Sequence, residues 1–153
     1  MLKKYTMHTH HLILLMLVTS LVSCMPRGNQ EKNYQSFADY PVYPEANLWP
    51  QYTPEATTFT LWSPPAQKVE LRLYEKGQGG KPYATLSMLE EKPGLWKATI
   101  RKDLKGAYYT YRVKTDTAWL EKTPGIYARA TGVNGKRAMV VDLESTNPEG
   151  WEN

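Results

Sequence analysis

The side chains that most often carry catalysis are scarce in this chain of 153 residues. Its three histidines are His8, His10 and His11, all close to the N-terminus, and its single cysteine is Cys24. Imidazole-based triads, thiolate nucleophiles and the usual zinc sites require these residue types. Once an N-terminal signal is removed and Cys24 is modified, the remaining domain offers none of them. The sequence therefore predicts no metal site, no cofactor and no nucleophilic triad.

Carboxylates are plentiful, but their spacing does not suggest catalysis. A glycosidase needs two carboxyl groups that face each other across a cleft, with the pKa of one raised by burial. Here most acidic residues stand in expected turns or alternate outward on expected strands. They are Glu70, Glu75, Glu90, Glu91, Asp103, Asp116, Glu121, Asp142 and Glu144. Solubilising surface charge is the favoured interpretation, and no catalytic pair is visible.

Aromatic residues with polar tips are common, with 11 tyrosines and 5 tryptophans against 2 phenylalanines. Such rings suit both a sandwich core and stacking on the C–H face of a pyranose. Trp62 and Trp96 stand on alternating segments and are expected to pack in the core or between sheets. Trp119 follows a turn at residues 115–117, with Arg112 on the segment before it. It could form a ligand platform, and from the residues alone packing remains the alternative.

The first 24 residues, "MLKKYTMHTHHLILLMLVTSLVSC", have the pattern of a secretory signal. Lys3 and Lys4 precede the apolar run 12–18, which is too short for a membrane-spanning helix. The end of the stretch, "LVSC", resembles a bacterial lipobox, which implies cleavage after residue 23 and acylation of Cys24; an ordinary cleaved signal is the alternative. The sequence thus predicts a lipoprotein signal peptide at 1–23. It also predicts an exported bacterial lipoprotein, held by acyl chains on the outer membrane or cell surface.

Without Lys3 and Lys4, the 19 basic residues become 17 against 15 acidic ones, a net charge of about +2. That balance gives no reason to propose a nucleic acid as partner. Residues 24–45 are polar and then proline-rich, and are predicted to be a flexible tether from the membrane.

Residues 46–144 show the pattern of a small all-β domain. Short alternating segments are separated by Gly, Pro and Asp turns, without a helical period. The expected strands are 57–62, 69–74, 83–88, 95–100, 107–114, 119–120 and 138–143. Within the second of them, Val69, Leu71 and Leu73 should point inward. This spacing predicts an antiparallel β-sandwich.

Three stretches, in this order, resemble the N-terminal region of debranching and branching enzymes of glycoside hydrolase family 13. "TTFTLWSPPAQKVELRLYEKG" carries a Phe-x-x-Trp-Ser-Pro pattern followed by a strand, and "KPGLWKATIRKDLKGAYYTYRV" carries Gly-x-Trp and Gly-x-Tyr-Tyr-x-Tyr strands. "YARATGVNGKRAMVVDLESTNPEGWEN" resembles the junction between the family 48 carbohydrate-binding module and the catalytic barrel of type I pullulanases. The resemblance covers about residues 48–153 and implies an immunoglobulin-like (E-set) β-sandwich.

The resemblance also implies a function. Such modules bind α-glucans (starch, glycogen or pullulan), and the pullulanases that contain them hydrolyse α-1,6-glucosidic bonds. A catalytic barrel needs about 250 residues, so we expect this chain to be non-catalytic on its own. It would be the N-terminal portion of a pullulanase-like protein of carbohydrate metabolism, with residues 145–153 as a linker toward a barrel.

Binding residues carry over only in part. Tyr111, Arg112 and Trp119 match positions that help to cradle the sugar in glycogen-binding relatives, with Arg in place of Lys. The second stacking tryptophan of those relatives has no counterpart in "EKGQGGKPY". The dipeptides 49–50 (Trp-Pro) and 125–126 (Gly-Ile) also depart from the usual pullulanase pattern.

Two other functions stay open. The domain could pack against a catalytic barrel without binding sugar itself, in which case it should expose an apolar patch. Alternatively, it could be a subunit that is completed by a separately encoded barrel.

Overall fold

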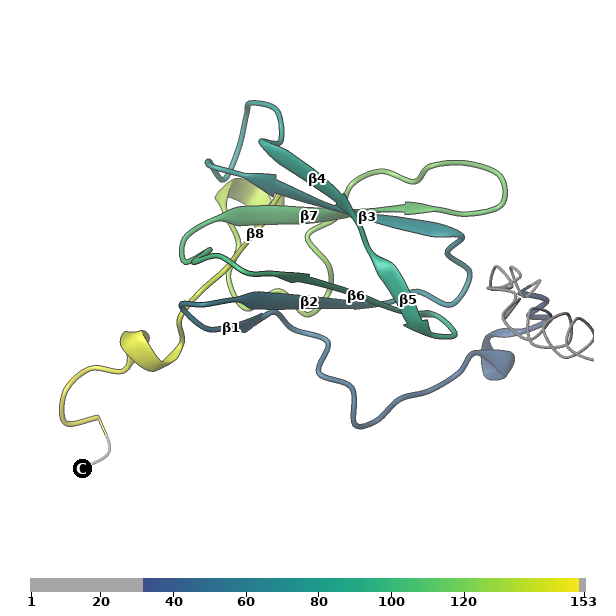
Figure 1. Ribbon diagram of the computed structural model, residues 1–153, viewed down its shortest axis with the longest axis horizontal. Helices are drawn as coiled ribbons and strands as arrows, with labels where there is room; N and C mark the ends of the chain where they lie inside the picture. Colours follow the sequence, from purple (N-terminus) through teal and green to yellow (C-terminus); the bar gives the residue numbers. More distant parts are fainter. Residues whose placement is uncertain (1–31, 152–153) are drawn as a thin grey trace, which may run out of the picture. The chain divides into compact units, whose positions relative to one another are not determined.

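The computed structural model describes residues 32–151. Within this range the chain forms eight strands and three short 3-10 helices (Figure 1). The strands are β1 (Gln51–Tyr52), β2 (Thr57–Trp62), β3 (Lys68–Tyr74), β4 (Ala84–Ser87), β5 (Leu89–Lys92), β6 (Leu95–Ile100), β7 (Tyr108–Lys114) and β8 (Ala138–Met139). The 3-10 helices span Phe37–Asp39, Val133–Gly135 and Glu144–Thr146.

The strands make two antiparallel sheets that face each other as two layers (Figure 1). The first sheet has the order β1-β2-β6-β5, and the second has the order β4-β3-β7-β8. β3 and β7 pair over their whole length, from Lys68 opposite Lys114 to Tyr74 opposite Tyr108. No α-helix occurs in residues 32–151. The predicted all-β antiparallel sandwich is confirmed.

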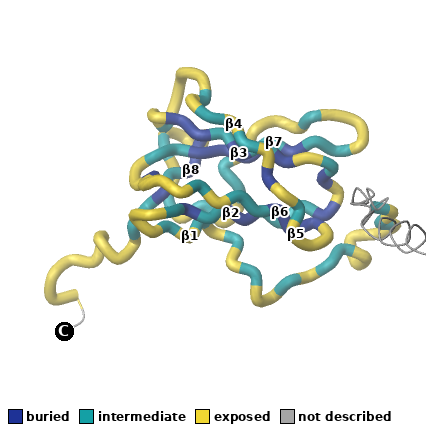
Figure 2. Tube along the Cα trace, viewed as in Figure 1, coloured by how far each residue is buried: buried dark blue, intermediate teal, exposed yellow. Residues whose placement is uncertain are grey.

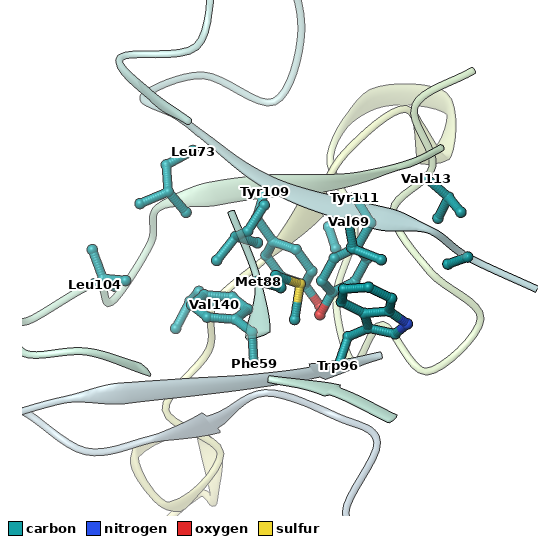
Figure 3. Packing of buried hydrophobic residues seen from close by; sticks show 13 residues of the cluster. Phe59, Val69, Leu73, Met88, Trp96, Leu104, Tyr109, Tyr111, Val113 and Val140 are labelled. Carbon is teal, nitrogen blue, oxygen red and sulfur yellow. The ribbon is translucent and has the colours of Figure 1, made fainter. Parts of the chain in front are cut away.

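One hydrophobic core lies between the sheets (Figures 2 and 3). As predicted, Val69, Leu71 and Leu73 of β3 point inward, each with at most 2% of its surface exposed. Phe59 of the first sheet meets them, and its ring contacts Tyr109 of β7 edge-on with the ring centroids 5.1 Å apart. Each such buried side chain contributes about 1.5–3 kcal/mol to the free energy of unfolding. The core therefore determines which residues of β3 and β7 are left on the outer face.

The two tryptophans expected to pack lie on opposite faces of the first sheet. Trp96 is 5% exposed and belongs to the core, and its Nε1 donates to the carbonyl of Ser63 at 3.2 Å. Trp62 lies half-buried on the other face, where its Nε1 donates to the carbonyl of Pro41 at 2.8 Å. Trp96 is thus a core residue as predicted, whereas Trp62 packs against the N-terminal segment and not between the sheets.

Most expected strands are present, with some differences. β1 was not among the expected strands, and β4 is one residue shorter at each end than the predicted 83–88. β2 and β6 have the predicted bounds, and β3 and β7 differ by one residue at their first position. β5 was expected to be part of a turn because its sequence, "LEEK", is mostly charged; it pairs with β6 as an edge strand, where charges can face solvent. β8 ends after Met139, earlier than the predicted 138–143. Residues 119–120 contribute only an isolated bridge to β7.

Residues 32–45, part of the predicted tether, run beside the first sheet (Figure 1). Phe37 and Tyr40 contact the ring of Trp62 edge-on, with centroid distances of 6.3 and 6.0 Å. These contacts place this part of the segment on the sandwich. Residues 24–31 lie outside the described residues, so the tether stays a prediction.

The signal peptide 1–23 and Cys24 also lie outside the described residues, as do the last two residues of the expected linker 145–153. Between residues 32 and 151, no helix is both long enough and apolar enough to cross a membrane.

Candidate functional site

Trp119 lies beside the end of β7, where the chain turns back on itself. The amide of Thr115 donates to the carbonyl of Ala118 at 2.9 Å and closes the turn. The amide of Leu120 then donates to the carbonyl of Val113 at 2.8 Å. The returning chain therefore follows β7, and the indole stands at the edge of the second sheet.

Arg112 fixes the indole of Trp119. Its guanidinium lies over the ring, 5.1 Å from the centroid, a cation–π contact. Its Nε donates to the carbonyl of Leu120 at 3.4 Å. Both side chains are half-buried, so part of the indole remains accessible while its orientation is set. The structure thus brings together two of the three residues predicted for sugar binding.

The third predicted residue, Tyr111, points the other way. It is 3% exposed and belongs to the core, where its ring contacts Tyr109 edge-on at 5.6 Å. Successive side chains on a strand face opposite sides of the sheet, so Tyr111 cannot share a face with Arg112. The prediction that Tyr111 lies together with Arg112 and Trp119 is therefore corrected. The Tyr111 ring packs in the core, on the opposite face of the sheet from Arg112. Sugar binding by the other two stays a prediction.

The outer face of the second sheet carries further polar side chains next to Arg112. The strand register places Glu70 directly opposite Arg112, and Ser87 on the other side of Glu70. Arg72 donates to Oε2 of Glu70 from Nε at 3.2 Å and from Nη2 at 2.8 Å. In the sequence, Glu70 and Arg72 have the pattern of solvated surface charges. Only the register shows that they form a partly buried ion pair beside Arg112 and Trp119.

The glycine-rich loop after β3 is anchored by Arg137, a residue to which no sequence motif pointed. Arg137 is 5% exposed, and its guanidinium lies 3.6 Å from the centroid of the Tyr74 ring. It also donates to the loop carbonyls of Lys76, Gly79 and Gly80. Because it satisfies three carbonyls and stacks on an aromatic ring, this buried charge is well compensated. Arg137 therefore holds this loop, residues 75–83, at the end of β3 that carries Tyr74.

A hollow, here named the aromatic groove, lies on the outer face of the first sheet. It lies between Trp62, Tyr127 and the chain that precedes β1. Its lining includes Phe37, Val42, Tyr43, Trp49, Trp62 and Tyr127. The guanidinium of Arg129 lies 4.4 Å from the centroid of Trp49. Ile126 precedes Tyr127 and is 90% exposed. Trp49 and Ile126 are two of the positions where the sequence departs from the pullulanase pattern, and both are on or next to this groove.

Five carboxylates in residues 32–151 pair with lysine or arginine side chains, namely those of Glu45, Glu70, Glu90, Glu91 and Asp142. No group of three His, Cys, Asp or Glu side chains in this range is arranged to hold a metal ion. Glu91 pairs with Lys97 at 2.6 Å, and Asp142 pairs with Lys105 at 3.0 Å.

Comparison with known families assigns the sandwich. The model of carbohydrate-binding module 48 (isoamylase N-terminal domain) matches residues 46–126, more than half of the chain. The chain belongs to the carbohydrate-binding module 48 family. The match extends from before β1 through the turn that carries Trp119, so the candidate site lies inside the module. It also confirms the family expected from the sequence motifs.

Pullulanases are among the relatives of this module. The chain is 30% identical over 116 residues to chloroplastic pullulanase 1 of Arabidopsis thaliana, covering 69% of this chain and 12% of the plant protein. It is 33% identical over 110 residues to the pullulanase of Klebsiella aerogenes, covering 67% of this chain and 10% of that protein. The chain thus spans only about a tenth of the length of the pullulanases it matches.

Solved pullulanases contain the same fold. The apo pullulanase of Paenibacillus barengoltzii superposes with a TM-score of 0.68 and 43% sequence identity, covering 72% of this chain and 16% of the enzyme. A mutant of that enzyme complexed with maltotriose superposes with a TM-score of 0.72 and 40% identity, covering 80% of this chain and 19% of the enzyme. Residues 32–151 of the present chain form the sandwich with its flanking segments and include no part of a (β/α)₈ barrel.

The buried tyrosines predict an alkaline loss of stability. Burial raises the pKa of the Tyr109 and Tyr111 hydroxyls, and the neighbouring Tyr109 adds to the shift at Tyr111. In the unfolded chain a tyrosine ionises near pH 10. Because the folded-state pKa of each of these tyrosines lies above that value, its contribution to the free energy of unfolding is fully present below about pH 10. That contribution is lost as the pH rises further. We expect the urea midpoint to fall steeply above pH 10, and Tyr111→Phe to make that fall shallower.

The measurement is urea unfolding followed by tryptophan fluorescence between pH 8 and 11.5. Tyr127→Phe, at an exposed tyrosine, is the matched control and should keep the wild-type slope. If Tyr111→Phe also kept the wild-type slope, Tyr111 would not be buried as described.

Proposed function

We propose that this chain is a non-catalytic α-glucan-binding module of a pullulanase-like debranching protein, with its site at Trp119 and Arg112. The observation that carries the proposal is the indole of Trp119, presented at the sheet edge and held by Arg112. A pyranose offers C–H groups to an aromatic face, and its hydroxyls need partners such as the N–H groups of Arg112. Membership of a carbohydrate-binding family and the pullulanase–maltotriose complex support an α-glucan as the ligand.

Such a site should bind weakly. One aromatic platform with a few hydrogen bonds corresponds to a dissociation constant of about 0.1–1 mM, or about 4–5.5 kcal/mol. Many binding positions along one polysaccharide raise the effective affinity without any new contact. Polymeric glucans are therefore the ligands on which binding should be detected most easily.

Replacing the platform tests this function. We expect wild-type protein to be retarded in native gels that contain amylopectin or pullulan, compared with gels without glucan. Trp119→Ala should weaken binding by roughly tenfold or more, because stacking accounts for much of so small a binding energy. Mobility as a function of glucan concentration gives the dissociation constant of each protein.

Trp151→Ala is the control, since Trp151 is 75% exposed and lies in the C-terminal segment beyond β8. It should migrate like the wild type. Equal retardation of Trp119→Ala and wild type would exclude this site, and no retardation of wild-type protein would reject glucan binding itself.

A second function, packing against a catalytic barrel, is favoured by the aromatic groove. Phe37, Val42 and Ile126 on or beside this groove are 76%, 74% and 90% exposed. Exposed apolar side chains that gather in one place commonly mark a protein–protein interface. The barrel could belong to the same protein or to a separately encoded chain.

Polar substitution of this surface separates the two functions. We expect a pullulanase barrel, produced without its own module, to retain wild-type protein in a pull-down, and Val42→Ser/Ile126→Ser to abolish retention. Wild type and the double variant should bind glucan equally, since neither Val42 nor Ile126 touches Trp119. Lys136→Ser, at an exposed residue outside the groove, is the control. Equal retention of the double variant and wild type would contradict docking through the groove.

We also propose that the protein is anchored to a bacterial membrane by lipid on Cys24, on the strength of the lipobox-like "LVSC" alone. Acyl chains contribute about 0.8 kcal/mol per buried methylene, and more than one chain gives stable anchoring. In cells fed an alkyne fatty acid, we expect wild-type protein to be labelled and found with membranes, and Cys24→Ala to lose both properties. Label that persists on Cys24→Ala would refute acylation at this residue.

A further inference from the structure

We propose that the glucan site extends beyond Trp119 along a polar strip formed by Arg112, Glu70 and Ser87, and that Glu70 binds the hydroxyls of longer α-glucan chains. The inference rests on the proposed function of the Trp119 site. It goes beyond that function because it assigns a binding role to a carboxylate and predicts a dependence on the length of the ligand.

The strip crosses three neighbouring strands. Ser87 of β4 lies opposite Glu70 of β3, and Glu70 lies opposite Arg112 of β7. Directly paired residues point to the same face of a sheet, and here the core occupies the other face. With strands spaced about 4.8 Å apart, the strip is about 10 Å long and runs across the strand direction. Trp119 stands next to its Arg112 end.

Glu70 is held ready to accept hydrogen bonds. Both hydrogen bonds from Arg72 go to the same carboxylate oxygen, Oε2. Within residues 32–151, the other oxygen, Oε1, accepts no hydrogen bond from protein. The side chains of Glu70 and Arg72 are 24% and 23% exposed, so the pair is partly shielded and still reachable from solvent. A carboxylate that is already fixed by its neighbour loses little freedom on binding, which favours affinity.

The order of groups along the strip suits a sugar chain. Arg112 can only donate hydrogen bonds, ionised Glu70 can only accept them, and Ser87 can do both. Sugar hydroxyls donate and accept, so a chain that leaves the Trp119 platform meets complementary partners in turn. Hydrogen bonds with a charged partner are stronger than neutral ones. A strip of about 10 Å has room for roughly two sugar rings beyond the one on the platform.

Chain length is the property that separates the strip from the platform. We would titrate the full chain with maltose, maltotriose, maltotetraose and maltohexaose, and follow binding by NMR. For wild type we expect affinity to rise with length up to three or four rings. Glu70→Gln should bind maltose like wild type but bind maltohexaose about three- to tenfold more weakly, because the neutral amide oxygen still accepts a hydrogen bond but a weaker one than the carboxylate does. Trp119→Ala should be weaker at every length.

Two controls guard against a purely structural effect of the substitution. Glu91→Gln removes a carboxylate that is also paired with a cation, Lys97, but on the first sheet, and should bind every length like wild type. Glu70→Asp keeps the charge, and provides a second variant at the same site if Glu70→Gln lowers the urea midpoint. It should also lose affinity for maltohexaose, because its shorter side chain withdraws the acceptor.

The outcomes are distinct. If both Glu70 variants bound every length like wild type while Trp119→Ala was weaker, the strip would be refuted and the platform would stand. If Trp119→Ala also bound like wild type, or if wild type bound none of these sugars, the proposed function would fail and the strip with it.

Discussion

The alternation of side chains along β7 is the constraint on which the rest of the structure depends. Tyr109, Tyr111 and Val113 point into the core, and Arg112 between them points outward. A shift of one residue in the pairing with β3 would expose two tyrosines and bury a guanidinium without a partner. The loss of apolar burial and the uncompensated charge would both favour the observed register. The core therefore decides which residues can form a binding surface.

The candidate site combines this rigid strand with a less regular element. Arg112 is fixed because β7 is paired along its whole length with β3. Trp119 lies on a return segment that pairs with β7 only through isolated bridges. Backbone hydrogen bonds at Thr115, Leu120 and Thr123 hold this segment, and the guanidinium stack sets the orientation of the indole. The indole of Trp119 is thus oriented by Arg112 of β7. The same guanidinium lies next to the indole, where a ligand stacked on the ring would also meet its N–H groups.

The sequence predicted the strands in which apolar and polar residues alternate clearly. It missed the features that depend on which strands and loops lie next to each other. β2 and β6 were predicted to the residue because apolar side chains alternate cleanly between turns. β5 was missed because its charged residues resemble a turn, and only an edge position makes them acceptable in a sheet. Tyr111 was placed in the site by resemblance, although alternation alone puts it opposite to Arg112. Arg137 could not be found, because its partners are backbone carbonyls of a loop whose position no motif reveals.

The two candidate surfaces lie on opposite sides of one core. Arg112 and Trp119 belong to the second sheet, whereas the aromatic groove lies over the far face of the first sheet at Trp62. Between them are the packed side chains of both sheets, Phe59 and Tyr109 among them. Close-packed interiors shift little when a ligand binds at a preformed surface. The two proposed functions, glucan binding on one side and docking of a protein on the other, would not compete for the same residues and are therefore compatible within one small sandwich.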